Sequence, residues 1–75
     1  MSVRLVFLAR LADLAGAGER EVAATSLETI LGELGSDFTG PRIKLALNGT
    51  ILTQRSDIEL RDGDELAFLP PVSGG

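Results

Sequence analysis

Hydrophobic residues recur at two different spacings along the chain, and each spacing predicts a different kind of element. Five short runs alternate between apolar and polar positions or are rich in apolar and β-branched residues, which is typical of β-strands. The runs expected to be strands are Val3–Ala9, Arg20–Ala24, Ile43–Leu47, Thr50–Leu52 and Glu65–Leu69. A sheet of short strands is therefore expected.

One segment in the middle of the chain shows helical spacing instead. Its apolar residues recur three or four positions apart and would form a single stripe along a helix. These residues are Leu27, Ile30, Leu31 and Leu34. Thr25 and Glu28 fit a capping box, in which each side chain hydrogen-bonds the other residue's backbone amide. Gly35 is expected to end the helix.

Three polar, glycine-containing segments are expected to be turns. Asp13–Glu19 separates the first two strands, and Asp62–Asp64 precedes the last one. Asn48–Gly49 predicts a hairpin, because a type I′ turn needs positive φ at both central residues. This order of elements favours an α+β fold in which a mixed sheet wraps over one main helix. Residues 1–69 are expected to form this domain, and residues 70–75 an extended tail ending in Gly-Gly.

The composition argues against several classes of function. The chain has no Cys and no His, so it lacks a thiolate nucleophile and the most frequent general base. Its formal net charge is −4 and its basic residues are dispersed, which argues against nucleic-acid binding. No apolar run approaches the ~20 residues of a membrane span, and no leader-like segment precedes the first strand. We expect a soluble, cytoplasmic protein without a membrane or nucleic-acid partner.

Two short motifs resemble ligand sites, but turns explain both better. Gly16–Glu21 begins like a dinucleotide-binding loop, yet the third glycine is missing and a strand rather than a helix is expected to follow. Asp62–Glu65 clusters carboxylates that would suit Ca²⁺ or Mg²⁺, but it lacks the ligand spacing of an EF-hand. We expect no metal site and no cofactor bound by this chain.

The last six residues combine a stiff segment with a bare end. Two prolines restrict the backbone after the last strand, and two glycines could enter a channel too narrow for any side chain. The segment expected to thread such a channel is Pro70, Pro71, Val72, Ser73 and Gly74, followed by Gly75. A frayed end is the simpler interpretation. A reacting main-chain carboxylate on Gly75 would nevertheless give the chain a chemical role that needs neither Cys nor His.

The predicted strands also imply an exposed apolar surface. Side chains alternate between the two faces of a strand, and one helix can cover only one face of the sheet. Leu8, Ile51 and Leu69 are therefore expected to form an aliphatic patch beside the root of the tail. Scattered surface aliphatics are common. A contiguous patch on a small domain, however, usually marks an interface, so we favour partner docking.

The ending DGDELAFLPPVSGG (Asp62–Gly75) resembles the C-terminal signature of the MoaD-type branch of the MoaD/ThiS sulfur-carrier family. The resemblance continues more weakly through VFLARLADLAG (Val6–Gly16) and LALNG (Leu45–Gly49), so it covers nearly the whole chain. Aliphatic residues stand at Leu8 and Leu69, where relatives often carry aromatics. The resemblance implies a ubiquitin-like β-grasp fold.

It also implies a reaction in which the catalytic groups belong to partners. An E1-like adenylyltransferase of the MoeB type would use ATP and Mg²⁺ to adenylylate the C-terminal carboxylate. A sulfur donor would then displace AMP and leave a thiocarboxylate on Gly75. The large subunit of molybdopterin synthase, of the MoaE type, would transfer this sulfur to a pterin precursor. The chain would be a non-catalytic small subunit.

Other functions remain compatible with the sequence. A sulfur carrier for thiamine thiazole or cysteine synthesis, or a ubiquitin-like protein modifier, would use the same activated Gly75 on a different acceptor. A non-covalent interaction module would need the fold and the patch but not a free terminus. Co-purification of a large synthase subunit, a thiazole synthase or a ladder of conjugates would distinguish the acceptors.

Overall fold

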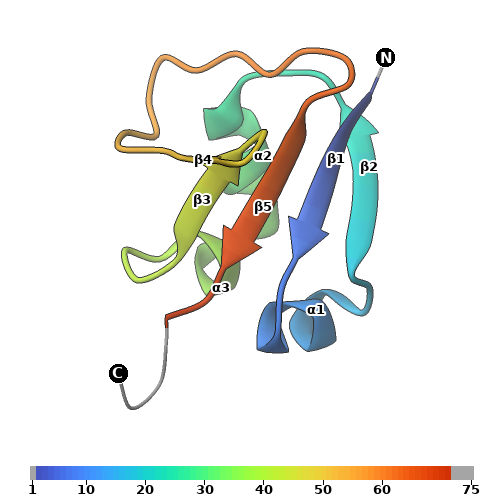
Figure 1. The fold of residues 1–75 in the computed structure, drawn as a ribbon, viewed down its shortest axis with the longest axis vertical. Helices are drawn as coiled ribbons and strands as arrows, with labels where there is room; N and C mark the ends of the chain where they lie inside the picture. Colours follow the sequence, from blue (N-terminus) through green and yellow to red (C-terminus); the bar gives the residue numbers. More distant parts are fainter. Residues whose placement is uncertain (1, 72–75) are drawn as a thin grey trace.

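The computed structural model describes residues 2–71 and contains five strands and three helices (Figure 1). In chain order they are β1 (Ser2–Phe7), α1 (Arg10–Ala15), β2 (Glu19–Ala23), α2 (Leu27–Leu34), α3 (Ser36–Thr39), β3 (Lys44–Leu47), β4 (Thr50–Ile51) and β5 (Glu65–Leu69). The tail residues Val72, Ser73, Gly74 and Gly75 lie outside the described residues.

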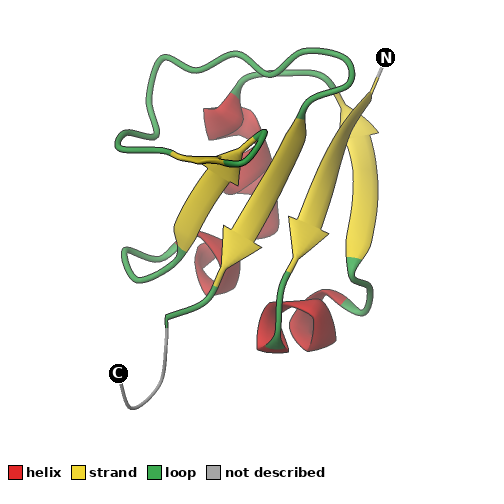
Figure 2. Cartoon of the chain, viewed as in Figure 1, coloured by secondary structure: helices red, strands yellow, loops and turns green. Residues whose placement is uncertain are grey.

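The strands form one mixed sheet with the order β2-β1-β5-β3-β4. The central strand β5 runs parallel to its neighbour β1, and the other neighbouring strands pair antiparallel. Helices α2 and α3 lie behind one face of the sheet, and α1 lies at its lower end (Figure 2). The expected mixed sheet packed on one main helix is confirmed. β5 lies in the middle of the sheet and is paired with β1 on one side and β3 on the other.

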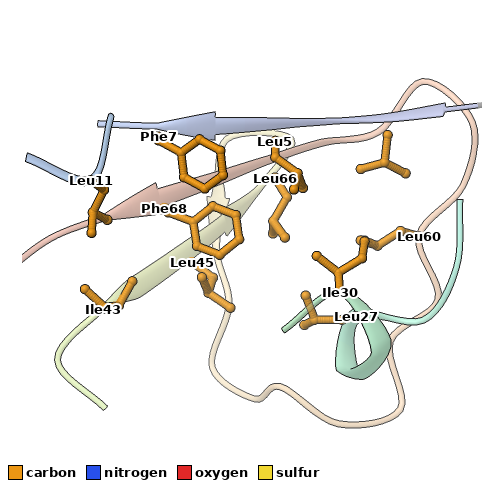
Figure 3. Close-up of a cluster of buried hydrophobic side chains, with 11 residues drawn as sticks. Leu5, Phe7, Leu11, Leu27, Ile30, Ile43, Leu45, Leu60, Leu66 and Phe68 are labelled. Carbon is orange, nitrogen blue, oxygen red and sulfur yellow. The ribbon is translucent and has the colours of Figure 1, made fainter. Parts of the chain in front are cut away.

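The core forms between the sheet and α2. From β1, the alternate residues Val3, Leu5 and Phe7 are buried, as the strand periodicity requires. Figure 3 shows their partners, Leu66 and Phe68 from β5 and Leu27 and Ile30 from α2. The rings of Phe7 and Phe68 stack with centroids 5.2 Å apart. This stacked pair fixes β5 against β1 close to the point where the tail begins.

The connection between β1 and β2 differs from the expected turn, because Asp13 lies inside the helix α1. The expected first strand was also too long: β1 ends at Phe7, and Ala9 has a φ of 52° that breaks the extended backbone. Leu11 is buried against the core, which stabilises a helix too short to persist alone. The turn itself begins at Gly16, whose φ of 77° ends the helix.

The start of α2 also corrects the expected capping box. The N-cap is Ser26, one residue after Thr25, and its hydroxyl accepts a hydrogen bond from the Thr29 amide at 3.2 Å. Glu28 is therefore not at the third helical position, where a capping box needs it. The backbone carbonyl of Thr25 instead accepts from the Leu60 amide at 3.0 Å. Gly35 ends the helix, as expected.

The Asn48–Gly49 hairpin is confirmed, with φ values of 51° and 88°. The Asn48 side chain also fixes the turn before β5. Its amide nitrogen donates to the Asp64 carboxylate at 3.0 Å, and its oxygen accepts from the Glu65 amide at 2.9 Å. The other Asp64 carboxylate oxygen accepts from the Arg61 amide at 2.8 Å. Two turns distant in sequence thus support each other at the start of β5.

Acid is expected to destabilise the fold partly through Asp64. Hydrogen bonds from Arg61, and secondarily from Asn48, hold the pKa of this carboxyl below its ordinary value of 3.8. The unfolded chain binds the proton at higher pH, so the stabilisation is complete above the ordinary pKa and is lost as pH falls through the lowered one. Urea midpoints measured from about pH 5 down to about pH 2 should therefore fall less steeply for Asp64→Asn. Equal slopes for parent and variant would contradict this assignment.

Candidate functional site: the open sheet face and the root of the tail

The face of the sheet opposite α2 carries a continuous apolar row. Strand register places Val6 beside Ala67, Ala67 beside Ala46, and Ala46 beside Ile51. Residues directly opposite on neighbouring strands share a face, so this row crosses four strands. The Ile51 side chain is 49% exposed at the end of the row. The open face is therefore apolar through its middle.

Two residues of the expected patch, Leu8 and Leu69, lie at the end of this face where the tail begins, and the third, Ile51, lies at the edge of the sheet on β4. Leu69 is the last residue of β5 and is half-buried, and its register partner is Lys44. Leu8 follows β1 and is 41% exposed, and its amide donates to the Phe68 carbonyl at 3.3 Å. Leu8 thus follows the neighbouring strand β1 on one side of Leu69, and Ile51 lies on the other side, on β4, with β3 between them. We call these three residues the aliphatic patch.

A groove of about 720 Å³ runs beside the root of the tail. We call it the tail-root groove. It is lined by the apolar residues Pro41, Ile51, Leu69, Pro70 and Pro71 and by the cations Arg42 and Lys44. Two residues of the aliphatic patch and both prolines of the expected tail therefore share one concave surface.

A second hollow, of about 360 Å³, shares Pro41, Arg42 and Pro71 with this groove. Its remaining lining comes from Arg10, at the start of α1, and from the segment around α3. The tail thus leaves the sheet at the end where α1 and the connection between α3 and β3 lie (Figure 1).

Arg55 was not anticipated from the sequence, yet it fixes the segment beside the tail root. It belongs to the long connection between β4 and β5, and its guanidinium donates to the backbone carbonyls of Thr39, Gly40 and Ile43. These three acceptors bracket Pro41 and Arg42, which line both hollows. A single arginine in a polar loop carries no sequence signal for such a role.

Replacing Arg55 with alanine should loosen this segment and destabilise the domain by about 1–3 kcal/mol, because three part-buried carbonyls lose a charged donor. Arg61→Ala is the matched control, since the Arg61 side chain is exposed and its change should stay within about 0.5 kcal/mol. Urea unfolding measures both. The same midpoint for Arg55→Ala and Arg61→Ala would exclude the positioning role.

Side-chain chemistry is sparse in the described part of the chain. Residues 2–71 contain no group of three or more acidic side chains placed to hold a metal ion. Among the same residues, no helix combines the length and the apolar character needed to cross a membrane. What the site offers is a concave, largely apolar surface beside the root of the tail.

Comparison with known proteins agrees with this geometry. The ThiS family model matches residues 5–75. The molybdopterin synthase sulfur carrier subunit of Escherichia coli (strain K12) is 30% identical over 97% of this chain and 99% of its own length.

Solved structures extend the comparison to the fold. SAMP1 from Haloferax volcanii superimposes with a TM-score of 0.77 at 28% identity, covering all of both chains. One chain of the protein–protein complex of subunits 1 and 2 of molybdopterin-converting factor from Helicobacter pylori 26695 matches with a TM-score of 0.71, also at 28% identity and over all of both chains. The chain therefore belongs to the ThiS family and is a MoaD/ThiS-type sulfur-carrier protein with the ubiquitin-like β-grasp fold.

Proposed function

We propose that this chain is the sulfur-carrier subunit of a molybdopterin synthase and that it carries the sulfur as a thiocarboxylate on Gly75. The observation that carries the proposal is the match to the E. coli sulfur carrier subunit over nearly the full length of both chains. The tail-root groove supports it, because the root of the tail and a docking surface then meet at one end of the sheet.

The chemistry needs two steps at the Gly75 carbonyl. A carboxylate is a poor electrophile, so one of its oxygens first attacks the α-phosphorus of ATP, and pyrophosphate leaves. A sulfur nucleophile from the donor then attacks the acyl carbon, and the bond to the AMP oxygen breaks. The product is a thiocarboxylate, whose sulfur a pterin precursor accepts on the large subunit. Nucleotide, Mg²⁺ and bases are supplied by the activating enzyme and the large subunit.

The role of the folded domain is to present the tail. β5 is paired on both sides and its Phe68 ring is fully buried, so the base of the tail is fixed relative to the open face. Docking through the aliphatic patch then places the terminus at a set distance from the interface. The proposed successive partners are an E1-like adenylyltransferase of the MoeB type and a large subunit of the MoaE type.

Intact mass spectrometry tests the proposal directly. The chain is incubated with an E1-like activating enzyme, ATP, Mg²⁺ and a sulfur donor, and one oxygen should be replaced by one sulfur. Adding the large subunit and the pterin precursor should restore the original mass as the pterin gains sulfur. An unchanged mass in the first step would rule out a sulfur carrier and leave a non-covalent module.

Protein modification is the second candidate, and the superposition on Haloferax volcanii SAMP1 favours it, since archaeal proteins of that name are described as small modifiers. Both functions share an activated Gly75 and differ in the acceptor, which is a lysine amine in one and a pterin in the other. Expression of the tagged chain in its own host distinguishes them. A ladder of covalent conjugates would support protein modification and contradict the proposed role in molybdopterin synthase.

Docking through the aliphatic patch makes its own prediction. Leu69→Asp places a charge where the interface excludes water, which costs about 1–3 kcal/mol or more, so binding to either partner should weaken at least ~5-fold. Ile51→Asp, at a more exposed position, should act in the same direction. The control is Gly32→Asp, which adds the same charge to an open position on α2, behind the sheet (Figure 2). Calorimetry on folded variants measures this, and parental affinity of both patch variants would remove the patch from the interface.

A further inference from the structure

The basic residues of this acidic protein gather where the tail leaves the sheet. Three of the seven basic residues, Arg10, Arg42 and Lys44, line the tail-root groove or the second hollow. Of the eleven acidic residues, one, Asp37, is among their lining residues. The rest of the chain therefore carries more negative charge than the formal total of −4. We call the three cations the basic rim.

The opposite end of the open face has a different electrostatic character. There Arg4 lies 3.5 Å from carboxylate oxygens of both Glu19 and Glu65. The register places Glu21 directly beside Arg4 as well. Carboxylates thus outnumber the cation at that end, and the arginine is already engaged within the chain.

The cations of the basic rim are not engaged in this way. Within residues 2–71, no hydrogen bond or ion pair involves the side chain of Arg10, Arg42 or Lys44. Arg20 and Arg55, by comparison, both donate to backbone carbonyls. The rim cations are also exposed. They therefore keep their full capacity to pair with charges on another molecule.

The rim is continuous with the aliphatic patch. Lys44 is the register partner of Leu69, and both line the tail-root groove together with Ile51. A partner that covers the patch must therefore bring its own surface against Lys44 and Arg42. Like charges placed there would cost affinity, whereas carboxylates would gain charge-assisted contacts at the edge of an apolar contact.

We propose that the basic rim receives carboxylates of a partner protein that border the entrance of the channel taking up the tail. This inference rests on the proposed function, in which the tail enters a partner. It adds the charge of the surface around that entrance and the orientation of the carrier: acidic residues of the partner face Arg10, Arg42 and Lys44, and the acidic end of the open face points away from them. A nucleic-acid backbone is disfavoured, because three cations on a chain of net charge −4 do not form an extended basic surface.

Charge reversal at matched positions tests the rim. The variants are Arg42→Glu and Lys44→Glu, and the control is Arg61→Glu, which changes the net charge equally in the turn before β5. Association rates of parent and variants are measured by stopped flow with the E1-like activating enzyme and the large synthase subunit of the same organism. At about 0.1 M salt, where charges act over about 10 Å, each rim variant should associate on the order of 10-fold more slowly than the parent.

Salt and the control separate the possible outcomes. The difference should shrink at about 1 M salt, where the screening length is about 3 Å, and Arg61→Glu should differ little from the parent at either salt. The proposal for the basic rim would be wrong if the rim variants associate like the parent or are slowed no more than Arg61→Glu. The proposed function would then stay intact. Failure of the parent itself to bind either partner would overturn the proposed function and the rim together.

Discussion

Deletion of Gly75 is expected to reduce thiocarboxylate formation by on the order of 10²-fold or more while the domain folds normally. Removing one extended residue withdraws the carboxylate by ~3.3–3.6 Å. A misplacement of even ~1 Å in a reacting centre can cost on the order of 10²-fold in rate. The base of the tail cannot compensate, because β5 is anchored in the middle of the sheet.

Intact mass measures the thiocarboxylate yield, and a binding assay with the activating enzyme measures docking. Together they distinguish a terminus that falls short of the reacting groups from a domain that no longer docks. The truncated chain should bind with nearly parental affinity, since the aliphatic patch is intact. A chain extended by one residue after Gly75 is the companion variant, and it should fail because the reactive carbonyl is held in an ordinary peptide bond. Near-parental yield from both variants would show that the terminus is not the reacting group.

The sheet could be predicted because its strands depend on local alternation. β5 was expected over Glu65–Leu69 and lies there, and the Asn48–Gly49 hairpin has the positive φ values that its sequence requires. The two short helices could not be predicted in the same way. α1 holds six residues, and its position depends on Leu11 reaching a core assembled from distant strands. Tertiary burial, rather than local spacing, decides such elements.

The same distinction between local pattern and tertiary packing decides which parts of the site could be predicted. The aliphatic patch follows from strand alternation, so the exposure of Leu8 and Ile51 could be anticipated, although Leu8 follows the strand rather than belonging to it. Its role in docking remains a prediction. Arg55 and the basic rim depend on segments that only the fold brings together. Arg10 and Arg42 are 32 positions apart in the sequence, yet both line the second hollow.

Phe68→Ala is expected to lower the free energy of unfolding by about 3–5 kcal/mol. Phe68 is fully buried and stacks on Phe7, so truncation leaves a cavity and removes a ring contact at once. A domain of 75 residues has a total stability of roughly 4–11 kcal/mol. The variant should therefore be partly unfolded or melt more than about 10 °C below the parent.

Thermal and urea unfolding followed by circular dichroism provide the measurement, with Leu14→Ala as the control. Leu14 is 60% exposed, so its truncation should change stability by no more than about 0.5 kcal/mol. Phe38 meets the Phe7 ring edge-on at 5.3 Å and is only partly buried, so Phe38→Ala should fall between the two. Because Phe68 adjoins the last residue of β5, its loss should also release the tail root, and the variant should form thiocarboxylate more slowly even where it is folded. A Phe68→Ala protein with the parental unfolding midpoint would mean that the ring pair does not hold β5 in place.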